Sequence, residues 1–149
     1  MEEPIIEKLT KYGFEEAGKW EIRNKDTNIR LEIWNEKFRR MIDKPQPMIY
    51  AIVIGNKAKY IGSTIRGKKR GYRLQAGEYV ISELKLGKTK QIYEELKRRH
   101  ESAKLHCLEP PQYNHKGLRF LMLRDLENAL IKDLRTTEEY DGWNKKVDN

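Results

Sequence analysis

Two tyrosines and a cluster of basic residues are the side chains in this sequence that best suit chemistry on an anion. Tyr50 and Tyr60 stand ten positions apart, and a basic segment follows that contains Arg66, Lys68, Lys69, Arg70 and Arg73. The whole chain has a formal net charge of +8 and a pI near 9.5, which suits a polyanionic partner. Charge alone supports a nucleic-acid ligand and a merely soluble basic protein equally.

The elements that must position the tyrosines are two short strands. The apolar run of residues 49–54 is rich in β-branched side chains and predicts a strand buried on both faces. Residues 55–57 have the composition of a turn, and residues 59–61 return as a second strand. Across such a hairpin Tyr50 and Tyr60 lie nearly opposite each other, on the same face. Either tyrosine alone is equally well explained as a core residue.

One carboxylate lies on the apolar side of a predicted helix. Over residues 118–135, an interval of 100° per residue gathers five apolar side chains into one sector around Glu127: Phe120, Leu123, Leu130, Ile131 and Leu134. A carboxylate directed at a core needs a cation, a hydrogen-bond donor or a metal ion. A structural salt bridge to an arginine is the simpler explanation for an isolated Glu127.

The ordered set Ile49-Tyr50, Tyr60-Ile61-Gly62, Arg70, Glu127 and Trp143-Asn144 resembles the GIY-YIG nuclease family. The similarity extends over residues 48–146 and is greatest to the group of phage endonuclease II and the GIY-YIG restriction endonucleases. This chain departs from the family pattern at Met48, where the family name has its first glycine, and at Ser63, where members often carry lysine. Lys59 or Lys69 are the candidates to replace that lysine.

The resemblance implies a divalent-metal-dependent DNA endonuclease that hydrolyses phosphodiester bonds in restriction or phage-type DNA cleavage. The implied catalytic residues are Tyr50, Tyr60, Arg70, Glu127 and Asn144. Glu127 would hold one Mg²⁺ or Mn²⁺ per active site, and Arg70 would clamp phosphate oxygens, a task that lysine performs poorly. The implied DNA-binding residues are Arg66, Lys68, Lys69, Arg73 and Lys90, with double-stranded DNA as the partner. A module that binds nucleic acid on the same scaffold without catalysis is the alternative.

The expected fold is α/β (α+β), with a small central three-stranded antiparallel sheet flanked by helices. Its third strand is predicted at residues 104–108, after a helix over residues 90–100 that Thr89 caps, and a polar loop follows at residues 112–117. Residues 1–47 predict an N-terminal αββ appendage that contacts DNA, forms an oligomer contact or extends the sheet, whereas residues 48–149 form the nuclease-like core.

The cellular context follows from the single cysteine and from hydropathy. Cys107 has no partner for an intramolecular disulfide and lies among apolar residues, so we expect packed core and a reducing, cytoplasmic compartment. No apolar stretch approaches the roughly 18 residues that cross a membrane. The sequence leaves open the recognition site, the choice between nicking and double-strand cutting, the oligomeric state, the biological role and which tyrosine acts as the base.

Overall fold

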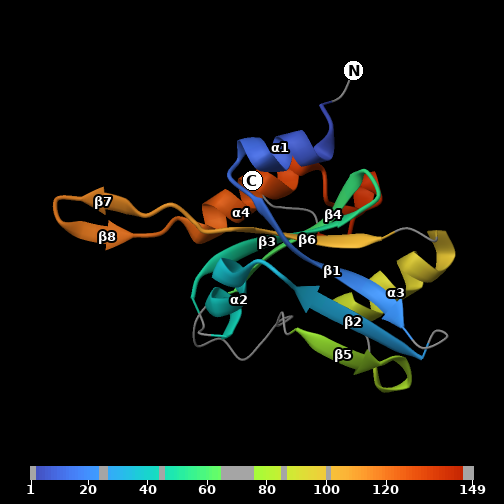
Figure 1. Ribbon diagram of the computed structural model, residues 1–149. Coiled ribbons are helices and arrows are strands. Elements are labelled where there is room, and N and C mark those ends of the chain that lie inside the picture. Colours follow the sequence, from blue (N-terminus) through green and yellow to red (C-terminus); the bar gives the residue numbers. More distant parts are fainter. Residues whose placement is uncertain are drawn as a thin grey trace.

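Six antiparallel strands form one sheet in the order β4-β3-β6-β1-β2-β5 (Figure 1). The computed structural model describes residues 3–23, 27–43, 46–64, 76–84, 87–99 and 102–145 of the 149 in the chain. The strands of the sheet are β1 (Glu15–Arg23), β2 (Asn28–Ile33), β3 (Met48–Ile54), β4 (Lys57–Thr64), β5 (Gly77–Val80) and β6 (Ala103–Leu108). The helices are α1 (Ile5–Lys11), α2 (Glu36–Asp43), α3 (Lys88–Arg99) and α4 (Leu123–Leu134), with single 3₁₀ turns at η1 (Ile81–Glu83) and η2 (Glu138–Tyr140).

The predicted fold class is confirmed, but the sheet is larger than the three strands expected. The strand pairing that the sequence did not predict is the one between β1 and β6, where Trp20 lies opposite Ala103. Strand β6 would otherwise present an unpaired edge, and the N-terminal hairpin β1–β2 covers that edge and continues the sheet. Strand β5 then pairs with β2 and was not predicted. The division of the chain at residue 47 stays a prediction.

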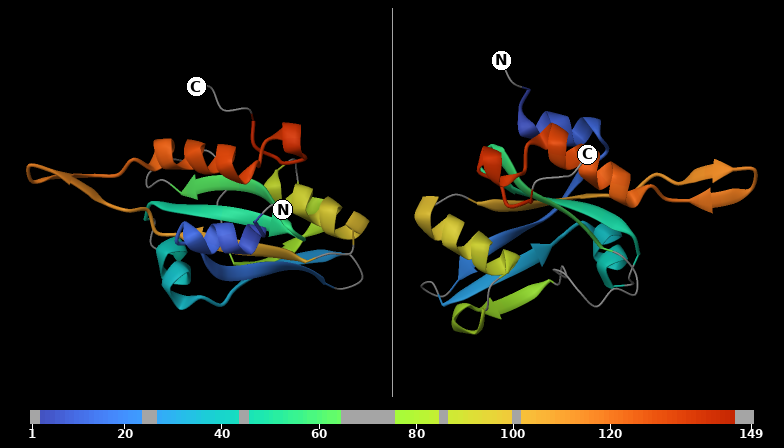
Figure 2. Two further views of the ribbon diagram at one scale, coloured as in Figure 1. Left: turned by 90° about the horizontal axis from the view of Figure 1, so that it is seen from above. Right: turned by 180° about the vertical axis from the view of Figure 1, so that it is seen from behind.

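Helices cover both faces of the sheet (Figure 2). On one face, Leu9 of α1 and Leu130 of α4 pack with residues of β3 and β4. On the opposite face, Phe38 of α2 and Ile92 of α3 pack with Tyr50 and its neighbours. All seven residues of β3 are buried, as the apolar run predicts for a strand between two layers.

A second, two-stranded sheet replaces the polar loop and the first turn of the helix that the sequence predicted. Strands β7 (Tyr113–His115) and β8 (Leu118–Phe120) form a hairpin that projects away from the rest of the molecule (Figure 1). Lys116 and Gly117 join them with φ angles of 50° and 87°, the left-handed conformation of a two-residue hairpin turn. Phe120 therefore belongs to a strand, and α4 begins only at Leu123.

None of the helices in the described part of the chain combines the length and the apolar composition of a membrane span.

Candidate active site

The two phenol rings lie side by side on one face of the β3–β4 hairpin, as the sequence predicts. Their centroids are 6.0 Å apart and their planes are tilted by 45°. The register places Tyr50 opposite Gly62 and Tyr60 opposite Ile52, so the rings meet diagonally. A Cβ atom on Gly62 would lie 2.5 Å from Cζ and Oη of Tyr50 and 2.8 Å from Cε2 of Tyr60. Only glycine at position 62 leaves room for both rings.

The two tyrosines differ in exposure and in their surroundings. Tyr50 is 1% exposed, whereas Tyr60 is half-buried. Burial, and after it the negative charge of Glu127, raises the pKa of Tyr60, and a side-chain hydrogen bond with Tyr50 partly opposes this shift. Tyr60 is therefore a neutral phenol at neutral pH, and it needs an additional cation before it can accept a proton.

A lysine that the sequence prediction missed lies over Tyr60. The Nζ atom of Lys88 is 4.4 Å from the Tyr60 ring centroid, within the range of a cation–π contact. It also donates a hydrogen bond of 3.1 Å to Oε1 of Gln91. Burial lowers the pKa of Lys88, an effect that Glu138 opposes and Lys145 reinforces.

Lys88 was missed because the helix was predicted to start too late in the sequence. We expected Thr89 to cap a helix beginning at Lys90, but α3 already includes Lys88. Two residues along a helix are about 200° of rotation, so Lys88 and Lys90 point in different directions. Lys90 is half-buried on α3, and its contact with phosphate stays a prediction.

Glu127 lies on α4 close enough to Tyr60 for its charge to raise the Tyr60 pKa. Its side chain is half-buried, whereas Leu130 and Ile131, which follow on the helix, are buried. No hydrogen bond or ion pair joins Glu127 to any other residue that the structure describes. The structural salt bridge that the sequence left open is therefore not formed within that part of the chain.

Asn144 binds the outer edge of strand β4. Its Oδ1 accepts a hydrogen bond of 2.8 Å from the Ile61 N–H, and its Nδ2 donates one of 2.9 Å to the Ile61 carbonyl. The hydroxyl of Thr136 donates to the same Oδ1 at 2.5 Å, and the Trp143 N–H donates to the Lys59 carbonyl at 2.7 Å. Asn144 thus fixes the strand segment directly after Tyr60. Its assignment as a catalytic residue stays a prediction.

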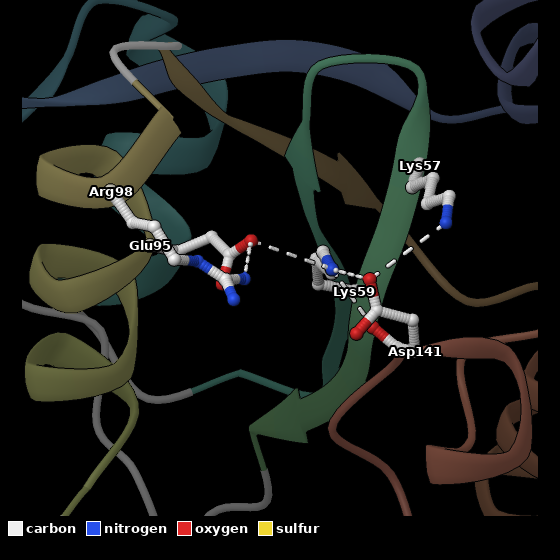
Figure 3. Close-up of polar contacts among 5 residues, drawn as sticks. All are labelled: Lys57, Lys59, Glu95, Arg98 and Asp141. Atoms are coloured by element: carbon white, nitrogen blue, oxygen red, sulfur yellow. Dashed lines mark hydrogen bonds and ion pairs between the residues drawn. The ribbon is translucent and has the colours of Figure 1, made fainter.

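A buried lysine connects β4 with α3 and with the segment after η2 (Figure 3). The Lys59 side chain is 1% exposed, and its Nζ lies 2.8 Å from the carbonyl oxygen of Asp141, 2.9 Å from Asp141 Oδ2 and 3.8 Å from Glu95 Oε1. Arg98 contacts both carboxylate oxygens of Glu95 at 2.8 Å. Lys59 is bound to these two acids, so among the residues described it is Lys88 that places a cation over the Tyr60 ring.

The basic segment predicted to bind DNA falls on residues 65–75, which lie outside the described residues. This applies to Arg66, Lys68, Lys69, Arg70 and Arg73. The described residues bring together Tyr50, Tyr60, Lys88 and Glu127, with Gly62 and Asn144 as supports of the strand.

Two solved structures resemble this chain. A mutant of EndoII from bacteriophage T4 aligns with 89% of this chain and 96% of its own, at 19% identity and a TM-score of 0.51. The restriction endonuclease HPY188I in complex with product DNA aligns with 98% of this chain and 85% of its own, at 15% identity and a TM-score of 0.44. No family model and no curated protein matches the chain. At this level of identity the likeness to EndoII establishes a shared fold.

Proposed function

We propose that this protein is a divalent-metal-dependent DNA endonuclease of the GIY-YIG type, which hydrolyses phosphodiester bonds of double-stranded DNA. One observation carries the proposal: Tyr60 lies beside a second phenol and under a cation, supplied by Tyr50 and Lys88, and within range of the negative charge of Glu127. The fold shared with EndoII of bacteriophage T4 and the net charge of +8 support it. Two biological roles are compatible with such an activity: restriction and the phage-type degradation of DNA.

The residues divide the work of hydrolysis among them. Tyr60 orients the attacking water, and its half-buried phenol is the one that reaches the substrate. Tyr50 packs beside Tyr60, with ring centroids 6.0 Å apart, and helps to hold the Tyr60 ring in place. Lys88 contributes positive charge near the phosphate, and Arg70 binds the non-bridging oxygens with its planar guanidinium group.

Glu127 fits the role of a metal ligand. Its carboxylate is partly accessible, and no other described residue binds it. Among those residues no group of three His, Cys, Asp or Glu side chains gathers into a site, and Glu127 is the one protein ligand that we propose. Mg²⁺ and Mn²⁺ accept one or two carboxylates together with water and substrate phosphate oxygens. Such an ion would lower the pKa of a bound water and neutralise charge on the phosphate.

A nucleic-acid-binding module without catalysis is the second candidate. The raised pKa of Tyr60 and the serine at position 63, where family members often have lysine, favour this alternative. It shares the same surface and the same partner, and differs only in the absence of bond cleavage.

The decisive experiment mixes the purified protein with supercoiled plasmid DNA, in Mg²⁺ or in excess EDTA. Nicked or linear DNA in Mg²⁺ alone supports the endonuclease. Retention of the plasmid on a native gel without cleavage, in Mg²⁺ and in Mn²⁺, would favour the binding module. Cleavage of equal rate in EDTA would contradict the dependence on a metal ion.

A further inference from the structure

The hairpin β7–β8 lies outside the main sheet and exposes all six of its strand residues. Figures 1 and 2 show it extended away from the body of the protein. An isolated hairpin of two short strands is marginally stable in water. Stacking of Tyr113 on Phe120, with centroids 5.8 Å apart, and a hydrogen bond of 2.9 Å from the Gly117 N–H to Asn114 Oδ1 hold this one in shape.

The charge of this segment has one sign. Residues 110–124 contain no aspartate and no glutamate, but they contain Lys116, Arg119 and Arg124, all of which are exposed. Lys116 occupies the tip of the hairpin. A second copy of the same segment would bring like charges together, whereas a polyanion complements them.

The tip carries a cation at a backbone position that does not favour it. Lys116 has a φ of 50°, a conformation that glycine and asparagine adopt with less strain. Around the tip the hairpin exposes apolar side chains as well, with Leu118 69% and Phe120 43% exposed. An exposed apolar surface flanked by cations is typical of a surface that binds a partner.

The hairpin is attached to the candidate active site at both ends. On one side, Leu108 at the end of β6 pairs with Ile49, the residue before Tyr50. On the other side, α4 begins at Leu123 and carries Glu127 in its second turn. At about 3.3 Å per residue, the chain from Leu108 to Lys116 reaches up to about 25 Å beyond the end of the sheet. A duplex held at Tyr60 and Glu127 therefore lies within reach of the tip.

We propose that the β7–β8 hairpin is an arm that contacts duplex DNA beside the cleavage site, with Lys116 and Arg119 on its phosphates. This inference rests on the proposed function and adds to it the element that extends the DNA contact. A two-stranded ribbon has a width that the major groove of about 12 Å accepts. The exposed apolar side chains of the arm then lie against the sugars and base edges, away from water.

The experiment measures binding of the full chain to a fluorescein-labelled duplex of about 30 base pairs, between about 50 and 200 mM salt. The background variant Glu127→Gln prevents cleavage during the titration. On that background, Lys116→Asn with Arg119→Gln removes the two charges of the arm, and asparagine preserves the left-handed turn. The matched control, Lys8→Gln with Lys11→Gln, removes two charges from α1, a helix that is not part of the arm.

The arm variant should weaken binding at about 100 mM salt on the order of 10-fold or more. Its plot of log K against log salt should be less steep than that of its parent, by about 0.9 per lost contact. The control should change neither quantity. Equal affinity and equal slope in the arm variant and in its parent would overturn the role of the hairpin in DNA binding, but not the proposed function. Failure of the parent to bind DNA would overturn the proposed function. Loss of an oligomer in sedimentation, with the salt slope unchanged, would show that the arm joins two copies and would also overturn the inference.

Discussion

Gly62 determines how closely the two phenols approach each other, because any side chain at that position would overlap both rings. Tyr50, at 1% exposure, is held in place by the core, and Tyr60 is the member of the pair that lies under Lys88 and whose pKa the charge of Glu127 raises. The sequence could not separate the two roles, since either tyrosine alone is equally well explained as a core residue. Burial and the surrounding charges separate them.

We expect Tyr60→Phe to lose more cleavage activity than Tyr50→Phe. Both changes keep the packed ring and remove only a hydroxyl, so the fold should survive in each. Loss of a positioned acid–base group reduces the rate by about 10²–10⁴-fold, and this loss should fall on Tyr60. Single-turnover cleavage of plasmid DNA measures the rates, and circular dichroism checks the fold. Wild-type cleavage by both variants would mean that the tyrosines are only core residues.

Lys88 should matter for cleavage, and Lys90 should matter less. Lys88→Met removes the cation that lies 4.4 Å from the Tyr60 ring, whereas Lys90→Met removes an equal charge two residues further along the helix. We expect the first change to slow cleavage by on the order of 10-fold or more and the second to have a smaller effect. Lys88→Arg restores a cation and should recover part of the rate. Equal losses at both positions would indicate a diffuse basic surface.

At the scale of elements, strand β4 depends on the segment that follows η2. Asn144 and Trp143 hydrogen-bond to the backbone of Ile61 and Lys59, and Lys59 itself binds Asp141. These contacts cover an edge that would otherwise expose unpaired backbone groups. The segment of residues 141–144 is therefore a structural support of β4, the strand that carries Tyr60.

Asn144→Asp should destabilise the protein although the two side chains have the same shape. The new carboxylate oxygen cannot donate to the Ile61 carbonyl and faces it instead, at a site that is 7% exposed. We expect a loss of about 2–3 kcal/mol in the free energy of unfolding, measured by urea titration. Asn56→Asp, in the exposed turn between β3 and β4, is the control and should change little. A wild-type midpoint for Asn144→Asp would contradict the role of this hydrogen bond.

Local sequence patterns predicted the strands and the turn around the site, but they did not predict which strands pair when these are far apart in the sequence. The apolar run of β3, its turn and the return in β4 follow from neighbouring residues, and all three are present. The pairing of β1 with β6 joins residues more than eighty positions apart, and no local pattern specifies it. The hairpin β7–β8 escaped prediction because its strands have three residues each and its turn has lysine where asparagine or glycine is usual.

At the scale of the whole molecule, two helical layers enclose the sheet, and a histidine is buried under one of them. His106 of β6 is 5% exposed, and its Nε2 has no hydrogen-bond partner among the residues described. Burial lowers the pKa of His106, with Glu16 opposing the shift and Lys104 reinforcing it. The folded protein therefore holds this imidazole neutral at a pH where the unfolded chain would protonate it.

Folding stability should fall as the pH drops below about 6.5, the ordinary pKa of histidine. The unfolded state binds the proton first, so the His106 contribution to the free energy of unfolding is intact above that pH and decreases below it, by at most about 1.4 kcal/mol per pH unit. Urea titrations of the wild type and of His106→Gln between about pH 7.5 and 5.5 separate the contribution of His106 from that of the other titratable groups. Parallel curves for the two proteins would contradict the prediction.

Cleavage by Glu127→Gln tests most directly whether the carboxylate beside Tyr60 belongs to a nuclease centre. The substitution keeps the size of the side chain and removes the charge that a divalent cation requires. We predict that plasmid cleavage in Mg²⁺ is abolished while DNA affinity and the urea midpoint stay at wild-type values. Asp125→Asn, an exposed acid in the first turn of the same helix, should cut normally. Cleavage by Glu127→Gln at the wild-type rate would contradict the metal assignment, and loss of folding would instead indicate a structural carboxylate.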